Sequence, residues 1–507
     1  MPWTLAIDLG NGGPKAGAVM PDGTLGPVAH RPVSVDIGAD GKATQDAAEW
    51  WSALGHAVRE VADLAGGWEA VAVAITGQWG STVPVDDSGQ PVGPVLLWAD
   101  TRARRYMKDV IGGAVTVQGF APHKVIPWVR ITGGAPTPSG ADPTGHSLLL
   151  QREFADVYAR SRWLLEPVDY LGMRMTGRAA ATPASMILSW LTDNRIGSAP
   201  GYVGELVTRA QRDPRRLPPL LPTGTVLGPL LPDVAESFGL PTAIPVVCGI
   251  PDLHAAVLGS GAIEPFASHA VISTTAWISS RVPFKKTDVL HSIASVPGFD
   301  PVLPMVANNQ EIGGGALRWL REQIIDADYD SLIAEAATAP PGGEGVLFAP
   351  WLSGERSPVE DKDVRGAFVG LSLRTDRATM IRSVMEGVAL NARWLFDSYE
   401  KFCKRHIGSL RLLGGGAQSD LWCSMYAGVL DRRVEQVAQP RDAQLVGAAL
   451  WSRVCLGETT LPEAARQVRV AQTFEPRDCA RDTYQEAYAQ YRGLYKRLKG
   501  LRTTASR

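Results

Sequence analysis

The chain has 507 residues, which is more than one hydrophobic core usually serves, so we expect two domains of substantial size. It is 45% hydrophobic and 20% charged, as soluble globular proteins commonly are, and its net charge of −2 argues against nucleic acid as a partner. Small anionic ligands are not excluded, because backbone amides can hold them without a basic surface.

The sequence argues against membrane contact, a cysteine metal site and a disulfide framework. The first apolar run contains Asp8 and lacks a basic leader, unlike a signal peptide, and no apolar stretch is long enough to cross a bilayer. Five cysteines are scattered without a CxxC pair, which favours reduced thiols and a cytoplasmic location. They are Cys248, Cys403, Cys423, Cys455 and Cys479.

Strand-like and helix-like stretches alternate along the first half of the chain, which predicts an α/β fold. The order is a strand, its partner across a Gly-rich turn, a helix, a strand, two short strands around a turn, a mainly helical stretch, a strand and a helix. Residues 131–146 and 197–232 are rich in Pro and Gly and are expected to be loops. The elements are Trp3–Leu9, Lys15–Met20, Ala47–Leu64, Ala70–Thr76, Pro84–Trp98, Ser147–Gly177, Ile244–Cys248 and Leu253–Leu258.

The second half repeats the opening pattern of a strand, a turn of small residues and a second strand. A Gly-rich helix start, a long helix, a strand that ends in three glycines, a helix and a charged amphipathic terminal helix follow. The ranges are His269–Thr274, Trp277–Val282, the helix start at Gly313-Gly314-Gly315, Ala378–Tyr399, Arg411–Leu413 and Asp482–Leu498.

The first candidate motif is the run Asp8-Leu9-Gly10-Asn11-Gly12-Gly13-Pro14-Lys15. Its glycines can present backbone amides to phosphate, and an Asp at a strand end can hold a hydrated Mg²⁺. Taken alone, a plain β-hairpin explains it better, because Asn-Gly is a strongly favoured hairpin dipeptide. The run matches neither the GxxxxGK[ST] loop nor a GxGxxG turn, so a dehydrogenase is not indicated.

Two loops of the second half could also approach a nucleotide. Thr274-Thr275 would offer hydroxyls and amides to phosphates, although singly it resembles an ordinary Ser/Thr-rich turn. Gly414-Gly415-Gly416 lies between a strand and a helix, where glycines allow a flat ring or a phosphate to approach the backbone. A tight turn between strand and helix is an equally good explanation of this run.

Two patterns in the first half are candidates for a hydroxyl-rich ligand. Asp252 follows a strand and precedes a helix, near the field of the helix N-terminus, although an isolated Asp there is more often an N-cap. Gln78-Trp79 and the run from Trp98 to Arg102 combine aromatic rings with bidentate polar groups, as polyhydroxylated ligands require. The simpler alternative is a core tryptophan beside a surface ion pair.

Each motif is weak alone, but their order and spacing resemble the FGGY carbohydrate kinases along nearly the whole chain. The resemblance is densest from Phe348 to Ala389 and is nearest to the xylulose kinases. The matching runs are Phe348-Ala349-Pro350, Gly354-Glu355-Arg356-Ser357-Pro358, Arg365-Gly366-Ala367-Phe368-Val369-Gly370-Leu371 and Glu386-Gly387-Val388-Ala389.

The resemblance implies an α/β fold of two ribonuclease-H-like domains of the actin/hexokinase ATPase type, with the active site in the cleft between them. We expect an N-terminal FGGY-type domain over residues 1–262 and a C-terminal one over 263–507. The implied activity is ATP-dependent phosphorylation of a small sugar or polyol hydroxyl, with a xylulose-like ketose as the first guess. ATP and Mg²⁺ are the implied cofactors, and a homodimer is left open.

The resemblance also assigns roles to individual residues. Asp252 is the expected catalytic base and contacts the sugar, and Asp8 is the expected Mg²⁺-associated carboxylate. The other expected sugar contacts are Gln78, Trp79, Trp98, Asp100 and Arg102. The expected nucleotide contacts are Gly10, Gly12, Gly13, Lys15, Thr274, Gly314, Gly415, Gly416 and Asp420.

The chain departs from the family pattern in the first loop and beside the sugar. Asn11, Gly12 and Pro14 stand where the family has hydroxyl residues, and Pro14 has no N–H to donate, so we expect weakened nucleotide binding. Gly80 and Leu253 replace polar residues that xylulose kinases usually place by the sugar.

Two rival functions remain open at this point. An actin-fold ATPase or ligand sensor could dispense with Trp98, Asp100 and Arg102, which are present. A non-catalytic sugar- or nucleotide-binding relative would be expected to lack Asp252, which is present as well.

Overall fold

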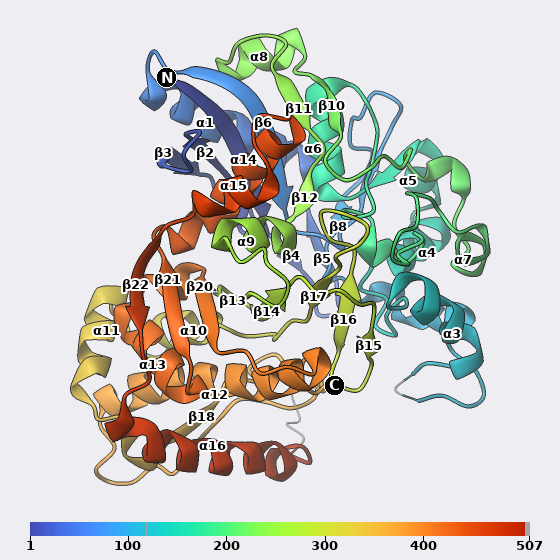
Figure 1. Cartoon of the computed structure of the whole chain (residues 1–507). Helices are drawn as coiled ribbons and strands as arrows, with labels where there is room; N and C mark the ends of the chain where they lie inside the picture. Colours follow the sequence, from blue (N-terminus) through green and yellow to red (C-terminus); the bar gives the residue numbers. More distant parts are fainter. Residues whose placement is uncertain (118, 502–507) are drawn as a thin grey trace.

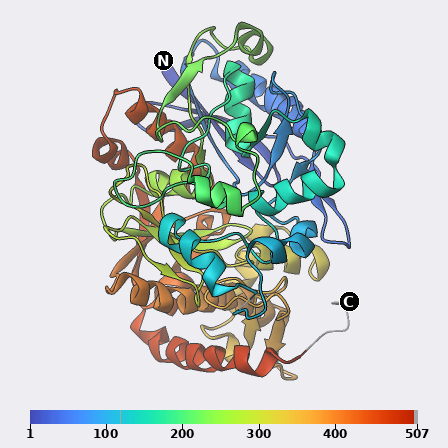
Figure 2. The same cartoon turned by 90° about the vertical axis from the view of Figure 1, so that its right-hand side faces the viewer.

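The two halves of the chain form two stacked lobes. The computed structural model describes residues 1–117 and 119–501. In Figure 1 the first half fills the upper lobe and most of the second half fills the lower one, while α14 and α15 of the second half lie against the upper lobe. The perpendicular view in Figure 2 keeps this division, with the C-terminal helix α16 along the bottom.

The upper lobe is built around a seven-stranded mixed sheet. Its order is β10-β11-β6-β1-β2-β3, and β12 pairs with the end of β6. The central strand β1 is antiparallel to β2 and parallel to β6, and its inward residues pack under α1 in a buried apolar cluster. The strands are β1 (Pro2–Gly10), β2 (Gly13–Val19), β3 (Leu25–His30), β6 (Glu69–Gly77), β10 (Val226–Pro229), β11 (Pro245–Val247) and β12 (Ile250–Pro251).

The lower lobe repeats this arrangement in a five-stranded sheet of order β14-β13-β20-β21-β22. Here β13 is antiparallel to β14 and parallel to β20, as β1 is to β2 and β6. The repeat expected from the sequence is therefore confirmed. The strands are β13 (Ser268–Ile272), β14 (Ala276–Ser280), β20 (Ser409–Leu413), β21 (Arg433–Val437) and β22 (Val470–Phe474).

Helices and small sheets complete the two lobes. In the upper lobe they are α1 (Ala47–Ala65), α2 (Met107–Val110), α3 (Pro122–Thr132), α4 (Pro143–Glu153), α5 (Ala155–Arg160), α6 (Pro167–Thr176), α7 (Gly204–Arg209), α8 (Pro232–Phe238) and α9 (Asp252–Ser260), with β4 (Asp36–Ile37), β5 (Ala43–Gln45), β7 (Val83–Val85), β8 (Val95–Leu96) and β9 (Trp163–Leu165). In the second half they are α10 (Gly315–Gln323), α11 (Tyr329–Thr338), α12 (Arg377–Cys403), α13 (Asp420–Leu430), α14 (Ala443–Cys455), α15 (Leu461–Arg466) and α16 (Asp478–Leu498), with β15 (Thr287–Asp288), β16 (Ile293–Val296), β17 (Met305–Ala307), β18 (Leu347–Ala349) and β19 (Ala367–Val369).

Two helices hold the lobes together. Helix α9 ends the first half and contacts β6 and β12 of the upper sheet, but it also packs on β13, β14 and β20 of the lower sheet. Helix α14 of the second half packs on β1, β2 and β6 of the upper sheet. The two helices also pack on each other, and residues of both halves share one buried apolar cluster around them. Gly259 and Gly447 lie at the crossing, where a Cβ on either would overlap a carbonyl oxygen of the other helix.

Most expected elements form, but one expectation is wrong. The stretch Ser147–Gly177 is mainly helical, as expected, although β9 lies within it and pairs with β7. Residues 131–146 and 197–232 are not all loop, since α3 ends at Thr132, α4 begins at Pro143, and α7 and β10 lie within the second range. Strand β10 is stabilised by its pairing with β11, which local composition does not reveal.

Substituting Gly447→Ala should destabilise the protein, because the added methyl group meets Ala255 backbone that cannot move aside without separating the helices. Overpacking of this kind costs about 1–3 kcal/mol or more. We expect a lowered midpoint of urea unfolding, measured by circular dichroism.

Gly55→Ala in α1 is the matched control. Its Cβ would meet only the Phe238 ring, at an ordinary 3.5 Å, and Ala is the better helix former by up to about 1 kcal/mol. Equal stability of the two variants would contradict the proposed backbone contact at the crossing.

Candidate functional site

Three of the residues expected to act in catalysis emerge at one edge of the upper sheet. Strands β1, β6 and β12 run parallel, with Asp8 opposite Thr76 and Gly77 opposite Pro251. Because the carboxyl ends of parallel strands meet at the same edge, Asp8, the residue after Gly77 and the residue after Pro251 lie side by side. The latter two are Gln78 and Asp252.

The carboxylate of Asp252 is held at the start of α9 with one oxygen engaged. Its Oδ1 accepts a hydrogen bond from the Leu253 amide at 2.7 Å. Burial, and secondarily the charge of Asp8, raises the pKa of Asp252 to about 7, although the Leu253 amide opposes the shift. Asp252 is the first helical residue and Pro251 occupies the N-cap position, so the alternative of an N-cap Asp does not apply.

Asp8 lies beside a lysine that reaches across to the other half of the chain. Lys15, its cross-strand neighbour in β2, makes an ion pair with Asp442 at 2.7 Å, just before α14. Burial raises the pKa of Asp8, and the nearby Lys15 charge partly offsets this. Asp442 was not expected from the sequence, where no motif marks it.

The first loop, between β1 and β2, forms a tight hairpin whose backbone is exposed only in part. Gly10 pairs with Gly13, and the positive φ falls on Gly13 (119°) rather than on the Asn-Gly pair. The carbonyls of Asn11 and Gly12 accept hydrogen bonds from Gln45 and Val33 within the upper lobe. Gly12 is exposed, and a Cβ added to it would meet nothing within 4 Å.

The second loop lies against the glycines that open α10. The amides of Gly313 and Gly315 donate to the Thr274 carbonyl at 2.9 and 3.3 Å. A Cβ on Gly314 would lie 2.9 Å from the Ser273 carbonyl oxygen, so the close approach requires glycine there. The Thr274 side chain is exposed.

The third glycine run adjoins the same strand end. A Cβ on Gly414 or Gly416 would press on Ile272, the last residue of β13, so these two glycines permit close packing of the turn. Gly415 is different, because it is exposed and has open space where a Cβ would stand. Asp420 is exposed at the start of α13 and accepts a hydrogen bond from Gln436 at 3.2 Å.

Gln78 is an unusual buried side chain. It is only 6% exposed, yet neither its amide nitrogen nor its oxygen has a hydrogen-bond partner among the described residues. The neighbouring Thr76 hydroxyl is in the same condition and was not expected from the sequence. Buried polar groups are normally paired, so this spot fits a ligand with hydroxyl groups. Trp79, which follows, is half-buried against the apolar cluster shared by both halves.

The backbone amide of Gly80, two residues after Gln78, is hydrogen-bonded to a buried glutamate. It donates to Glu166 Oε2 at 2.8 Å, and the side chains of Gly80's neighbours Trp98 and Leu188 close over it. Burial, and secondarily the charge of Asp169, raises the pKa of Glu166 well above its ordinary value. No motif in the sequence predicted this buried hydrogen bond.

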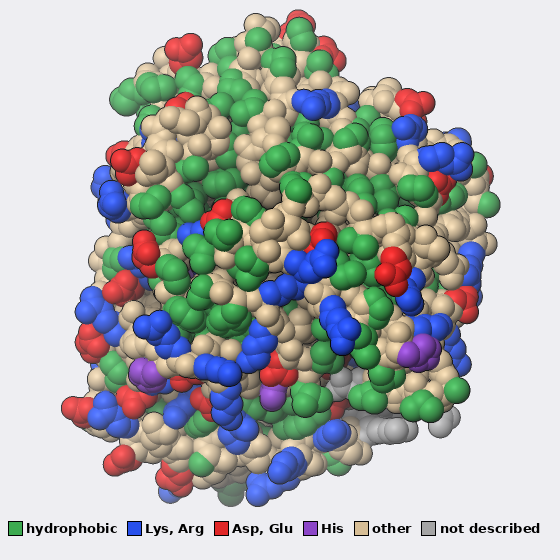
Figure 3. Space-filling model, turned by 45° about the vertical axis from the view of Figure 1, so that its right-hand side comes forward, with side chains coloured by type: hydrophobic (Ala, Val, Ile, Leu, Met, Phe, Trp, Pro, Cys, Tyr) green, Lys and Arg blue, Asp and Glu red, His purple; other side chains and the backbone are tan. Residues whose placement is uncertain are grey.

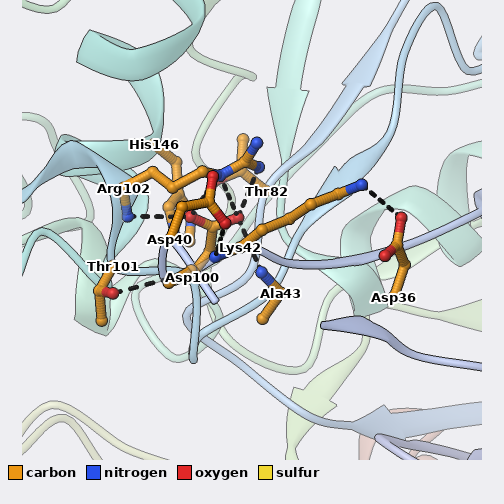
Figure 4. Close-up of polar contacts among 10 residues, drawn as sticks. Asp36, Asp40, Lys42, Ala43, Thr82, Asp100, Thr101, Arg102 and His146 are labelled. Carbon is orange, nitrogen blue, oxygen red and sulfur yellow. Dashed lines mark hydrogen bonds and ion pairs between the residues drawn. The ribbon is translucent and has the colours of Figure 1, made fainter. Parts of the chain in front are cut away.

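Asp100 and Arg102 form a closed pair, as Figure 4 shows. Arg102 donates to both carboxylate oxygens of Asp100, with its Nη2 at 2.6 Å, and the Ala43 amide donates to the same carboxylate at 3.1 Å. Asp100 is fully buried, so its carboxylate has no accessible surface for a sugar. The alternative of a surface ion pair is therefore wrong, since burial by β5 encloses the pair.

The three loops expected to bind the nucleotide are joined by a continuous set of contacts. Lys15 reaches Asp442, the Gly414 amide donates to the Pro440 carbonyl at 2.6 Å, and Gly414 packs on Ile272 beside the second loop. These contacts bring the loops of Asp8, Thr274 and Gly414, which come from both halves, together beside the edge of the upper sheet.

The residues present suit a Mg²⁺ ion that is held by few carboxylates and mainly by water and phosphate. Among residues 1–117 and 119–501, no three His, Cys, Asp or Glu side chains converge into a metal cage. Mg²⁺ commonly uses only one or two carboxylates, retains waters and binds substrate phosphates. The Asp8 carboxylate, with a raised pKa and no hydrogen bond from any described residue, can supply such a contact.

Family models for the FGGY family of carbohydrate kinases match residues 3–129, as the N-terminal domain, and 275–454, as the C-terminal domain. The chain belongs to this family. The carbohydrate kinase is 24% identical to a xylulose kinase of Staphylococcus epidermidis (98% of this chain, 97% of the relative). It is 27% identical to the L-xylulose/3-keto-L-gulonate kinase of Escherichia coli, with the same coverage.

Solved structures confirm the fold. The ligand-bound xylulose kinase of Lactobacillus acidophilus matches with a TM-score of 0.85 at 20% identity, over 99% of each chain. The carbohydrate kinase therefore has the actin/hexokinase-like α/β fold expected from its sequence.

The surface carries charges of both signs. On the face in Figure 3, Lys and Arg side chains are interspersed with Asp and Glu, and apolar side chains are frequent over the upper lobe. Within residues 1–117 and 119–501, every helix is too short or too polar to span a membrane.

Restoring hydroxyls with Asn11→Thr and Gly12→Thr should lower the KM for ATP by about threefold to tenfold. Both positions are exposed and neither has a positive φ, so threonine fits without strain and adds donors toward phosphate. Initial-rate kinetics with varied ATP would measure the change.

Gly13→Ala serves as the contrasting variant. Its Cβ would overlap the Arg31 carbonyl and its φ is 119°, so this change should weaken both stability and ATP use. An unchanged ATP KM in the double threonine variant would show that the loop does not face the nucleotide.

Proposed function

We propose that this carbohydrate kinase transfers the γ-phosphoryl group of ATP to a hydroxyl of a small ketose or polyol, with a xylulose-like ketopentose as the first candidate. The observation that carries the proposal is that two groups lie at the same sheet edge. They are the Asp252 carboxylate, whose pKa is raised to about 7, and the Gln78 amide, which has no hydrogen-bond partner among the described residues. The names of the relatives support the same substrate class.

Asp252 acts as the general base. Its Oδ1 is oriented by the Leu253 amide, which leaves Oδ2 to accept the proton of the attacking hydroxyl. A base with a pKa near neutrality combines a useful ionised fraction with proton affinity. Phosphoryl transfer otherwise needs positioning and charge neutralisation, which ATP-bound Mg²⁺ would supply beside Asp8.

The nucleotide would bind the loops that the contacts above bring together. Lys15 and the loop of Gly10, Gly12 and Gly13, of which Gly12 is exposed, suit phosphate groups, as does the exposed Thr274 hydroxyl. Open space over Gly415 suits a flat ring. The other proposed nucleotide contacts are Gly314, Gly416 and Asp420.

The sugar would occupy the space around Gln78, Trp79, Trp98 and Arg102. Hydroxyls can satisfy both ends of the Gln78 amide, and the half-buried tryptophans provide apolar surface for C–H groups. Asp100 contributes indirectly, because its saturated carboxylate fixes the guanidinium of Arg102.

Several sequence expectations remain proposals of the same kind. The domain boundary between residues 262 and 263 falls between the two matched family regions. The Mg²⁺ site, a homodimer and a cytoplasmic location fit a carbohydrate kinase, and each is open to direct measurement.

Asp252→Asn should lower kcat by about a hundredfold or more, because an amide keeps the shape but cannot take a proton. ATP binding, measured by calorimetry, should persist. The thermal midpoint at pH 8 should be equal to or above that of the wild type. An Asp whose folded-state pKa is raised is destabilising once ionised, so removing that charge costs no stability above pH 7.

The wild-type pH profile is the companion measurement. Because protonation removes the base, kcat/KM for the sugar should fall tenfold per pH unit on the acid side of a pKa at or below about 7. Near-wild-type turnover of Asp252→Asn, or a profile that is flat from pH 5 to 8, would remove Asp252 from the catalytic role.

A substrate panel tests the reaction itself. Pentuloses, pentitols, tetritols, hexuloses, gluconate and glycerol would be offered with Mg-ATP, and ADP release would be measured alongside sugar phosphate. We expect the highest kcat/KM for a ketopentose, because a site that binds hydroxyls rejects analogues that lack them.

The panel tests the proposed substrate and the proposed phosphoryl transfer separately. A clear preference for a sugar alcohol or for gluconate would discard the ketose while retaining the kinase. ATP hydrolysis without phosphorylation of any compound would favour an ATPase and contradict the proposed transfer.

A further inference from the structure

The run from Gly354 to Pro358, prominent in the sequence, takes no part in the contacts described so far. In the structure it brings an arginine of the second half to Trp98 of the first, one of the proposed sugar contacts. The guanidinium carbon of Arg356 lies 5.7 Å from the ring centroid of Trp98. A cation above an indole face is attracted by its π electrons, so this is a favourable contact between the two halves.

Arg356 is held in this position by buried acids of its own half. Its Nε and Nη2 lie 3.0 and 2.8 Å from the same oxygen of Glu311, which is only 10% exposed. The backbone amides of Glu311 and Arg356 both donate to Glu355 Oε1, at 3.0 and 2.9 Å. The other oxygen of Glu355 accepts from Asn391 at 2.6 Å. The side chain is therefore oriented before any ligand arrives.

Arg356 has hydrogen-bonding capacity to spare. A guanidinium has five N–H groups, and Glu311 faces only the Nε and Nη2 side of this one. Within the described part of the chain, Nη1 has no hydrogen-bond partner, and the side chain is 36% exposed. Its free donors are thus available at the tryptophan proposed to contact sugar.

The spacing also limits how a sugar can bind. A sugar ring sandwiched between the guanidinium and the indole would need about 7–8 Å, which is two carbon contact distances. The observed 5.7 Å is too short. A ligand must therefore lie beside the pair, where it can meet the edge of Trp98 and the N–H groups of Arg356 together.

We infer that Arg356 is the sugar-binding residue supplied by the second half, and that it donates a hydrogen bond to a substrate oxygen other than the attacked hydroxyl. The inference rests on the proposed function. It also connects sugar binding with the nucleotide loops, because Glu311 lies two residues before Gly313, whose amide bonds to the Thr274 carbonyl. Sugar on Arg356 would hold the two halves closed around both substrates.

Arg356→Ala should raise the KM of the best sugar in the panel by about tenfold or more and leave the KM for ATP within about twofold. The sugar KM of Arg356→Lys should lie between those of the wild type and Arg356→Ala, because lysine keeps the charge but loses the planar fork of the guanidinium. Arg365→Ala is the matched control from the same loop, since its guanidinium bonds only to the Lys362 and Val364 carbonyls among the described residues. That variant should behave as the wild type.

Monodeoxy analogues of the same sugar identify the contacted oxygen. In the wild-type enzyme, the analogue that lacks this oxygen should lose about tenfold or more in kcat/KM, and in Arg356→Ala it should equal the parent sugar. A purely structural role would not remove discrimination at one position.

Two results would overturn the inference while leaving the kinase intact. One is an unchanged sugar KM in Arg356→Ala. The other is an equal rise in both KM values with a lowered thermal midpoint and full discrimination among the deoxy analogues. Inactivity of the wild-type enzyme toward every sugar would instead overturn the proposed function.

Discussion

The crossing of α9 and α14 is the contact on which the active site depends. Gly259 and Gly447 let the two backbones touch, so each helix can lie against the sheet of the opposite lobe. Asp252 is the first residue of α9, and Asp442 immediately precedes α14. The same helix pair therefore joins the halves, presents the proposed base and brings the partner of Lys15 to the first loop. Both helices also begin beside Asp8 or Lys15, where their positive ends favour anionic groups.

The buried carboxylates of Asp8 and Asp252 lie close together, at a cost in stability. The pKa values of Asp8 and Asp252 are both raised chiefly by burial, and Lys15 is the cation that faces Asp8 most directly. An enzyme that binds a nucleotide with its metal ion can use this excess of negative charge, because the cation offsets it on binding. This unfavourable burial of charge is thus located at the proposed active site, as is common in enzymes.

The proposed sugar site combines groups that are already paired with groups that have no partner among the described residues. Arg102 donates to both carboxylate oxygens of Asp100, which fixes this pair before substrate binds. Gln78 is buried without a partner, and Arg356 has free donors on the opposite wall. Preformed rigidity lowers the entropy lost on binding, and unpaired groups supply specificity for hydroxyls. The departures at Gly80 and Leu253 leave that specificity to the remaining polar groups.

Strand ends, glycine runs and motif order are local features, so the amino-acid sequence was enough to predict the repeated strand–turn–strand pattern, the α/β class and the family, and to suggest Asp252 as the base. Only the tertiary structure showed that Asp442 reaches Lys15, and that Arg356 lies over Trp98 in the other half. It also decided that β9 interrupts an apparently helical stretch. These features depend on contacts between residues tens to hundreds of positions apart, and no local pattern in a single sequence records which distant side chains will meet.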